Sequence, residues 1–382
     1  WARIPFYFIF HSEDPIKSYF PYKYRNMKKG YLTAWLIGFG LMAFAQQPLR
    51  VGVAGLNHDH VYGLMENYKK GRVIILGIAE SDQQLISRYK QKYQLPDSLF
   101  YSSVSAMLEH IKPDAVLAYN AIADHLAVVE ACAPRGVSVM VEKPLATTVK
   151  QAERMKALVD QYHIHLLTNY ETTWYSSNQQ VYQMIYEQKK IGNIRKMVAH
   201  DGHQGPKEIG CSPDFLKWLT DPIKNGGGAV MDFGCYGANL MTWLMQGKAP
   251  IAVTAVTRHY KPDVYPKVDD DATILLEYPG AMGQIEASWN WPFGIKDLEV
   301  FGQTGYLHAL NGNELQERLQ NSYDPVKLSP PAYSDNLVYL ADVLRGKVHP
   351  VNDLSSLENN LIVVRILEAA KQSAREGKRI AL

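Results

Sequence analysis

The chain has 382 residues, of which 47% are hydrophobic and 20% charged, and this composition excludes a disordered or fibrous protein. Its 40 basic and 38 acidic residues give a formal net charge of +2, and without a dense basic stripe there is no electrostatic case for a nucleic-acid partner. Three widely spaced cysteines exclude a disulfide framework and a zinc site built on Cys-x-x-Cys pairs, and the length fits two domains.

The N-terminal segment has the features of a targeting signal. Met27 is the first methionine, and a short basic start, an apolar run over residues 32–44 and an Ala-x-Ala sequence ending at Ala45 follow it. This order predicts a secretory signal peptide over residues 27–45, and therefore export to the periplasm or the cell exterior, with no stable membrane insertion after cleavage. The alternative is an uncleaved N-terminal helix that anchors the protein in a membrane. Residues 1–26 are interpreted as translation from upstream of the true start, or as a genuine extension.

Strands and helices alternate over residues 48–168. Continuous apolar runs predict strands at residues 50–54, 73–79, 115–119, 138–141 and 165–168. The segments between them predict helices at residues 61–70, 82–93, 105–110, 125–134 and 149–162. This alternation predicts an α/β domain with a doubly wound parallel sheet covered by helices on both faces.

Over residues 169–382 the expected strands follow one another directly. They are expected at residues 196–200, 251–259, 272–278, 281–289 and 296–301, with a Pro-Gly turn between two of them. We predict an α+β domain with a mostly antiparallel sheet, which serves substrate binding and oligomerisation. A C-terminal helix over residues 354–376 ends at Gly377 and is a candidate to pack back on the first domain.

The first strand leads into a degenerate dinucleotide-binding loop. Gly55 holds the first glycine position of a Rossmann fingerprint, while Asn57 and His60 hold the second and third. Glu80 ends the second strand, where an acid accepts hydrogen bonds from the adenosine ribose. No cationic residue follows until Arg88, so NAD is favoured over NADP.

Two histidines of this loop, His58 and His60, raise the question of a metal site. Alternate residues at a helix start converge poorly on one ion, and no further ligand can be placed, so no metal is predicted. Imidazoles beside a cofactor phosphate at a helix N-terminus are one interpretation, and plain structural histidines are the other.

A strand that ends in Glu142-Lys143-Pro144 follows, and further along come a Gly-Gly-Gly run, Asp232 and Tyr236. In this order the motifs resemble the Gfo/Idh/MocA family, the oxidoreductases related to glucose-fructose oxidoreductase and inositol dehydrogenase. The resemblance extends over nearly all of residues 48–382. It implies a Rossmann domain followed by an α+β domain. A tyrosine at 236, where inositol dehydrogenase-like members have histidine, is similar to the glucose-fructose oxidoreductase and dihydrodiol dehydrogenase branches.

Further cofactor and substrate positions follow from the chain order and the resemblance. Asn120 and His125 follow the third strand and are expected to line the nicotinamide side, together with Glu142 and Lys143. Substrate contacts are expected from Lys143, Asp232 and Tyr236, and from two residues that open the second domain, Asn169 and Tyr170.

Lys143, Asp232 and Tyr236 form the predicted catalytic set. Tyr236 is expected to exchange the proton of the substrate hydroxyl or ketone, while Lys143 lowers the pKa of the phenol and Asp232 positions Lys143 or the substrate. Hydride passes between the substrate carbon and the nicotinamide. The alternative for Tyr236 is a buried helix tyrosine without a catalytic part.

Three functions remain open. A nicotinamide enzyme outside the cytoplasm is expected to retain its cofactor, so the first is an NAD-dependent oxidoreductase for a sugar, polyol or glycoside hydroxyl. The second is a glycoside-cleaving enzyme that borrows and returns a hydride. The third, favoured by His60 in the loop, is a non-catalytic carbohydrate-binding or scaffold protein. The resemblance implies a homodimer or homotetramer, and an exposed apolar sheet face would demand such cover.

Overall fold

The computed structural model describes residues 47–382. The predicted signal peptide over residues 27–45 and the segment 1–26 lie outside these residues. None of the helices within residues 47–382 combines the length and the apolar character needed to cross a membrane.

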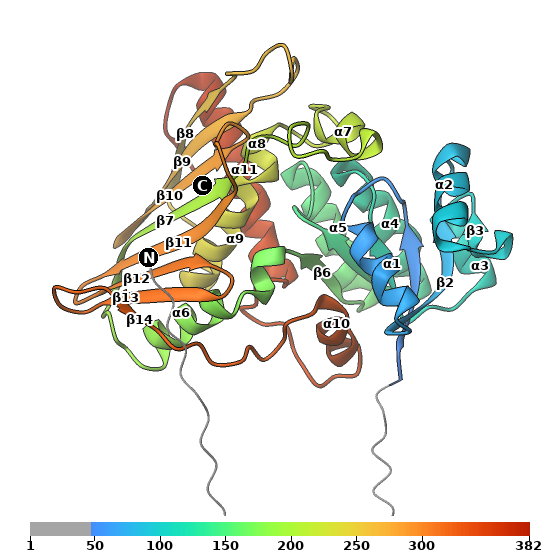
Figure 1. Ribbon diagram of the computed structural model, residues 1–382, viewed down its shortest axis with the longest axis horizontal. Coiled ribbons are helices and arrows are strands. Elements are labelled where there is room, and N and C mark those ends of the chain that lie inside the picture. The colour runs from blue at the N-terminus through green and yellow to red at the C-terminus, as the bar shows by residue number, and fades with distance from the viewer. Residues whose placement is uncertain (1–46) are drawn as a thin grey trace, which may run out of the picture. The chain divides into compact units, whose positions relative to one another are not determined.

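The first part of the described chain forms a six-stranded parallel sheet in the order β3-β2-β1-β4-β5-β6 (Figure 1), which confirms the predicted doubly wound sheet. Its strands are β1 (Leu49–Ala54), β2 (Val73–Ala79), β3 (Phe100–Tyr101), β4 (Ala115–Ala118), β5 (Ser138–Glu142) and β6 (Leu166–Asn169). The helices between them are α1 (Val61–Lys69), α2 (Gln83–Tyr93), α3 (Val104–His110), α4 (His125–Cys132) and α5 (Val149–Tyr162). The strand order reverses between β1 and β4, so a ligand crevice is expected at their carboxyl ends.

Side-chain caps fix where several helices begin. Asp82 accepts hydrogen bonds from the first backbone N–H groups of α2, and Thr148 accepts one at the start of α5. At the opposite end of the chain, Gly377 adopts a left-handed φ of 63° and terminates the last helix, as the sequence predicts.

The second sheet has nine strands in the order β14-β13-β12-β11-β7-β10-β9-β8-β15. It is mostly antiparallel, as predicted, and only β7 and β10 pair in parallel. Its strands are β7 (Ile194–Gly202), β8 (Ala252–Arg258), β9 (Asp271–Tyr278), β10 (Ala281–Ser288), β11 (Ile295–Gly302), β12 (Tyr306–Asn311), β13 (Glu314–Arg318), β14 (Asp324–Pro325) and β15 (Ile380–Ala381). The helices of this part of the chain are α6 (Ser176–Tyr186), α7 (Pro213–Leu219), α8 (Ala229–Asp232), α9 (Gly234–Leu244), α10 (Asn336–Leu344) and α11 (Leu357–Glu376).

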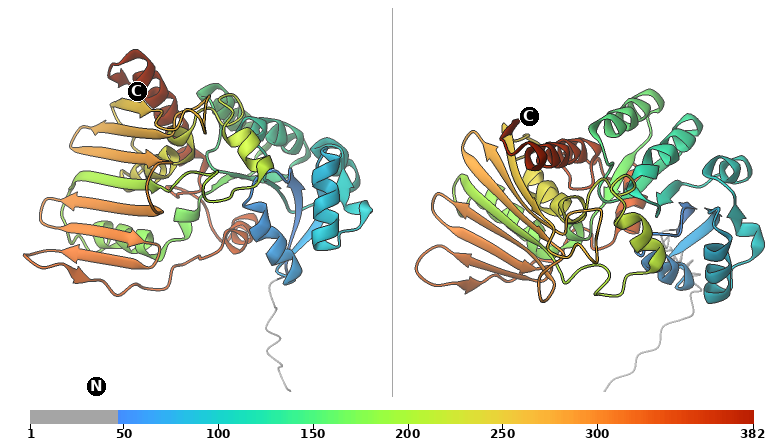
Figure 2. Two further views of the ribbon diagram at one scale, coloured as in Figure 1. Left: turned by 45° about the horizontal axis from the view of Figure 1, so that its top comes forward. Right: turned by 90° about the horizontal axis from the view of Figure 1, so that it is seen from above.

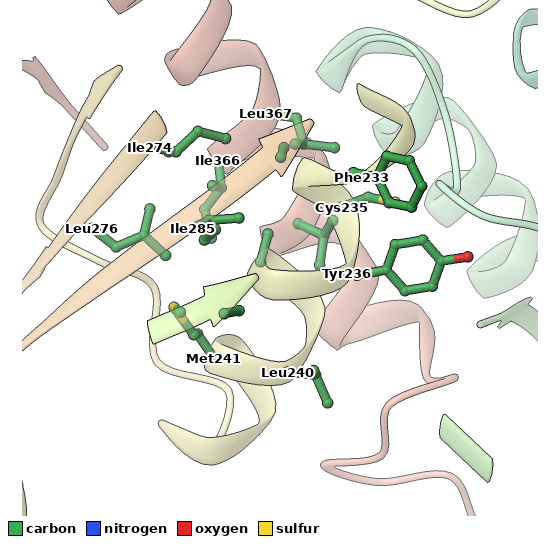
Figure 3. Close-up of a cluster of buried hydrophobic side chains, with 14 of the residues drawn as sticks. Phe233, Cys235, Tyr236, Leu240, Met241, Ile274, Leu276, Ile285, Ile366 and Leu367 are labelled. Atoms are coloured by element: carbon green, nitrogen blue, oxygen red, sulfur yellow. The ribbon is translucent and has the colours of Figure 1, made fainter. Parts of the chain in front are cut away.

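Helix α9 is buried along its whole length between this sheet and α11. Figure 3 shows its apolar side chains meeting Ile274, Leu276 and Ile285 of the sheet and Ile366 and Leu367 of α11. This packing fixes the position of the residues at the start of α9, which face the first sheet.

The last helices also belong to the first domain's cores. Leu337 and Leu340 of α10 pack with side chains of α1, β1 and β2, although α10 lies outside residues 48–168. Helix α11 packs against α9 and β8 and also against α5. The chain therefore returns to the first domain after completing the second sheet.

The face of the nine-stranded sheet that α9 does not cover is open (Figure 2) and mainly polar in its central strands. Asp297 accepts hydrogen bonds from the rings of His200 and His308, at 2.6 and 3.0 Å, and Glu286 accepts from the Thr273 hydroxyl at 2.7 Å. An exposed apolar face would have been a reason to infer an oligomer, and these central strands do not present one. A homodimer or homotetramer stays a prediction.

Candidate functional site

The loop after β1 approaches the end of β4 so closely that only glycine fits at position 55. Gly55 has a φ of +81°, and a Cβ there would lie 2.7 Å from the Cβ of Asn120 and 3.0 Å from the carbonyl oxygen of Tyr119. The Glu80 carboxylate, at the end of β2, accepts hydrogen bonds from the backbone N–H groups of Leu56 and Asp82, both at 2.9 Å. Gly55, Asn120 and Glu80 therefore meet at the switch point of the sheet.

A cleft of about 460 Å³ opens beside this loop, a size typical of small-molecule sites. Gly55, Asn57, Glu80 and Asn120 are among its lining residues, and the buried Oδ1 atoms of Asn57 and Asn120 have no hydrogen-bond partner in the described chain. These two acceptors fit the hydroxyl groups of a bound dinucleotide. No lysine or arginine is among the described lining residues, although Lys224 pairs with one of them, Asp124.

His125 begins α4 and is completely buried. Burial lowers the pKa of its imidazole to about 4, so the ring is neutral. Its Nδ1–H donates to the carbonyl oxygen of Leu145 at 3.1 Å, which leaves Nε2 as an acceptor with no partner among residues 47–382. His125 is thus a third unpaired acceptor near the cleft.

His58 and His60 occupy different environments. The His58 ring is buried between Phe215 and Trp218 of α7, with centroid distances of 4.7 and 5.4 Å, and is not among the residues that line the cleft. Burial, followed by the neighbouring His60, lowers the pKa of His58 well below its usual value. The His60 ring instead contacts Glu142 on the other side of the loop, at 2.8 Å.

Glu142 joins the loop to the next two strands. It accepts a hydrogen bond from Nδ1 of His60, and another from the Asn169 amide at 2.9 Å. Burial would raise the pKa of Glu142, but His60 and Asn169 lower it overall, so the carboxylate is ionised. Glu142, His60 and Asn169 line a second cleft of about 450 Å³, together with Trp174.

His58, His60 and Glu142 also offer ligand atoms that lie within 4.8 Å of one another. His58 Nδ1 already accepts a hydrogen bond from the His60 backbone N–H, and His60 is paired with Glu142. No further ligand was expected from the sequence, whereas the fold brings Glu142 to the two histidines, where it pairs with His60. The absence of a metal therefore stays a prediction.

Lys143 and Asp232 meet between the two sheets. Lys143 follows β5, and its ammonium donates to the Asp232 carboxylate at 2.5 Å and to the Asp232 carbonyl oxygen at 2.9 Å. The second carboxylate oxygen accepts from the Trp289 indole at 3.0 Å. Burial would lower the pKa of Lys143 and raise that of Asp232, yet their attraction reverses both shifts, so both groups are charged.

Tyr236 projects from α9 beside this pair, away from the second sheet (Figure 3). The Lys143 ammonium lies 4.8 Å from the centroid of its ring, and the ring is 2% exposed. Burial, and next the Glu171 carboxylate, raise the pKa of the Tyr236 phenol well above its usual value. This direction is opposite to the lowered phenol pKa expected from the sequence, because Asp232 offsets the charge of Lys143 and burial disfavours the phenolate.

The residues predicted for substrate binding lie on both sides of the catalytic set. Tyr170 is fully buried, and its ring meets Tyr236 edge to face at 5.6 Å. The Asn169 amide donates a hydrogen bond to Glu142, and its Oδ1 accepts one from the Trp174 indole N–H at 3.1 Å.

Three charged residues of this region lie outside the predicted catalytic, cofactor and substrate set. Lys296 of β11 lies 4.6 Å from the Tyr236 ring centroid and forms an ion pair with Glu171, which belongs to a 3₁₀ turn after β6. Asp201 of β7 is the cross-strand partner of Lys296 and is 1% exposed. Strand register brings Lys296 and Asp201 together without a local motif, whereas Glu171 directly follows the predicted substrate residue Tyr170.

Models of one protein family match both domains of the chain. Residues 49–170 match the model of an oxidoreductase family with an NAD-binding Rossmann fold, and residues 179–308 match the GFO/IDH/MocA C-terminal domain. A trans-1,2-dihydrobenzene-1,2-diol dehydrogenase of Xenopus tropicalis is 24% identical over 312 residues, which are 78% of this chain and 89% of that protein.

Two further similarities differ in extent. A D-xylose 1-dehydrogenase [NADP(+)] of Haloarcula marismortui is 28% identical over 44% of this chain and 45% of its own length. The structure of an aldose-aldose oxidoreductase from Caulobacter crescentus complexed with glycerol has a TM-score of 0.75 at 22% identity, covering 88% of this chain and all of that one. The latter shows a shared fold.

Proposed function

Because the chain belongs to the Gfo/Idh/MocA family of oxidoreductases, we propose that it transfers hydride between NAD and a hydroxyl-bearing carbon of a sugar, polyol or glycoside, and that NAD stays bound between turnovers. The observation that carries the proposal is the meeting of Lys143, Asp232 and Tyr236 directly after Glu142, which lines the second cleft of the parallel sheet. Similarity to a diol dehydrogenase and a xylose dehydrogenase supports a substrate with adjacent hydroxyl groups.

The cofactor is assigned to the clefts on both sides of the glycine loop. Glu80 and Asn57 would hold the adenosine half, and Asn120, His125 and Glu142 would lie on the nicotinamide side. The absence of a cation among the described lining residues supports NAD over NADP. When bound, the nicotinamide supplies the hydride acceptor or donor.

The three catalytic side chains carry out proton transfer, charge stabilisation and positioning. Tyr236 holds the proton that a ketone receives on reduction, and it takes the hydroxyl proton on oxidation. The Lys143 ammonium stabilises charge that develops on the substrate oxygen, and Asp232 holds Lys143 in place at 2.5 Å. Two charged groups held in a buried pair keep a fixed orientation, which favours this role over a purely structural one.

Retention of NAD is supported by residues 205–225, which we call the strap. Its Trp218 indole donates to the Asn57 carbonyl oxygen at 2.9 Å, and its Ser212 N–H donates to the Asp59 carboxylate at 2.8 Å. At its far end Lys224 pairs with Asp124, on the opposite side of the adenosine cleft, at 2.8 Å. In Figure 2 α7, in yellow-green, lies beside the strands of the first sheet. The strap thus connects both walls of the cleft.

The two residues that depart from the glycine fingerprint each have a partner in the strap or in β5. The Asn57 carbonyl oxygen accepts from Trp218, and His60 pairs with Glu142. These contacts account for bulkier residues at glycine positions without requiring a decayed cofactor site. They weigh against the non-catalytic carbohydrate-binding or scaffold protein.

We also propose export, from the signal-like residues 27–45. A nicotinamide cofactor is not freely supplied outside the cytoplasm, so an exported oxidoreductase needs a closed redox cycle. Oxidation of one sugar with reduction of another would provide it.

The first test is the ultraviolet spectrum and mass of any ligand released from purified protein, which should be NAD or NADH. A screen of sugars and glycosides then separates net oxidation from glycoside cleavage. Protein that is free of nucleotide and does not bind NAD in titration would contradict the proposal.

Replacement of either catalytic side chain should abolish turnover of the substrate so found. Lys143→Met and Tyr236→Phe are each expected to lower kcat by about 10²–10⁴-fold, because each removes a group that acts on the moving proton or charge. Lys190→Met is the matched control, since Lys190 pairs with Glu317 at 2.8 Å on the edge of the second sheet. Near wild-type turnover in either catalytic variant would exclude that residue's role.

A further inference from the structure

Two ammonium groups contact the ring of Tyr236. Lys143 and Lys296 lie 4.8 and 4.6 Å from its centroid, and they come from different sheets, at the end of β5 and in β11. Both distances are within the range of favourable cation–π contacts. Tyr236 is therefore held beside two cations rather than the single lysine that the sequence motif identifies.

The two cations differ in how their charge is offset. The Lys143 ammonium is engaged by Asp232 in a buried pair, with side chains 6% and 9% exposed. Lys296 pairs with Glu171, whose side chain is 50% exposed while that of Lys296 is 24% exposed. Lys143 has a fixed partner inside the protein, whereas the Lys296–Glu171 pair lies at the edge of the site and is open to solvent.

Glu171 is tied to the same region by a second contact, because it accepts a hydrogen bond from the Tyr175 hydroxyl at 2.8 Å. It also lines the second cleft with Glu142 and Asn169. One member of the ion pair therefore contacts the Tyr236 ring, and the other faces the cleft assigned to the nicotinamide side.

We propose that Lys296 and Glu171 act on Tyr236 as an opposed pair, in which the Lys296 ammonium favours the phenolate and the Glu171 carboxylate disfavours it. Lys296 is a positioning residue in this scheme, because it acts through Tyr236 and not on the substrate. The inference rests on the proposed role of Tyr236 in proton transfer. It adds a second lysine, outside the Glu-Lys-Pro motif, to the groups that set the proton affinity of that tyrosine.

Other groups face Tyr236 and must be held constant in a test. The titratable groups packed around it from the neighbouring elements are Glu142, Lys143, Tyr170, Asp232 and Cys235. None of these is changed when Lys296 or Glu171 is replaced. Differences in the pKa of the Tyr236 phenol between such variants therefore report on the Lys296–Glu171 pair.

The test measures ionisation at position 236 directly. A fluorinated tyrosine, whose phenol ionises at lower pH, is incorporated in place of Tyr236 in the full chain, and its ¹⁹F signal is followed against pH. Lys296→Met should raise the pKa of this phenol by about one unit, a tenfold smaller phenolate fraction at a given pH below the pKa. Glu171→Gln should lower the phenol pKa, and Lys296→Arg should restore the original value.

The kinetic counterpart uses the oxidation direction, in which Tyr236 must be deprotonated. The rise of kcat with pH should move to higher pH in Lys296→Met and to lower pH in Glu171→Gln. Lys190→Met again serves as the control, because it removes a lysine that pairs with a carboxylate of the same sheet, Glu317 of β13.

If the ion pair had only a structural role, replacing its two members one at a time would not shift the phenol pKa in opposite directions. Shifts in the same direction, or no shift in either variant of a folded protein, would overturn the inference. The ¹⁹F measurement needs no substrate, so its outcome is independent of turnover. Opposite shifts in a chain that transfers hydride to or from no sugar would contradict the proposed function alone.

Discussion

Asp201 is a buried carboxyl group for which the cost of burial outweighs the attraction of nearby cations, Lys296 first among them. It is 1% exposed, and its Oδ2 atom has no hydrogen-bond partner within residues 47–382. Burial is the main cause that raises the pKa of Asp201 to about 8. The folded protein therefore keeps this group protonated at pH values where the unfolded chain has released the proton.

This difference predicts a loss of stability as the pH rises. Between the unfolded pKa, near 4, and the folded pKa, the folded state binds more protons, so the free energy of unfolding falls by about 1.4 kcal/mol per pH unit. Asp201→Asn should remove this slope, so that the gain in stability of the variant over wild type is larger at pH 7 than at pH 5. Urea unfolding at both pH values measures it.

Asp324→Asn is the control, because Asp324 is exposed at the end of the second sheet. It should leave the pH dependence of wild type unchanged. An Asp201→Asn variant with the same pH slope as wild type would show that Asp201 is ionised in the folded state.

At the scale of residues, the sequence predicts those site members that lie in local motifs. Lys143 stands in Glu-Lys-Pro, and Asp232 and Tyr236 follow a glycine run. Lys296 and Asp201 have no such signal, because they meet only through the register in which β11 pairs with β7. The phenol pKa was predicted in the wrong direction for a related reason, since burial and the contact with Glu171 depend on the tertiary structure.

At the scale of elements, the α7 part of the strap decides what the glycine loop contacts. Ser212 caps α7 by accepting from the Phe215 N–H at 3.2 Å, and Pro213 stands at its first position. A serine followed by proline is a sequence signal for a helix start, although no helix was predicted here. Five strands and five helices of the first domain were predicted to within a few residues because each has a strong apolar pattern, whereas the two-residue edge strand β3 was missed. Helix α10 was missed, since its partners lie far back in the chain.

If the strap retains NAD, loosening α7 should release it. Trp218→Ala removes the indole that donates to the Asn57 carbonyl oxygen and packs against His58. We expect the variant to lose bound nucleotide about 5- to 150-fold faster than wild type, because about 1–3 kcal/mol of contacts to the loop are lost. Nucleotide remaining after timed gel filtration measures the rate.

Lys217→Ala is the matched variant, because Lys217 lies exposed on the same helix. It should retain nucleotide as wild type does. Equal retention in all three proteins would assign the strap a structural role only.

At the scale of the whole molecule, the site is shared between the two sheets. Lys143 belongs to the first, Asp232 and Tyr236 lie on helices packed on the second, and α10 and α11 return to the cores of the first. Residues 47–382 form one unit by their contacts. Unfolding of the second part alone would pull Leu337 and Leu340 of α10 out of the first part's core and expose apolar surface to water, which is costly.

We therefore expect one cooperative unfolding transition, and we expect NAD to stabilise the whole of it. After the nucleotide has been stripped, NAD at one hundred times its Kd should add about 2.7 kcal/mol, a rise in Tm of several degrees. NADP should add less at equal concentration, because the adenosine cleft has no cation among its described lining residues to meet the additional phosphate. Differential scanning calorimetry measures both effects. An equal or larger shift with NADP would reverse the cofactor preference, and two transitions of which NAD moves only one would show that the domains unfold independently.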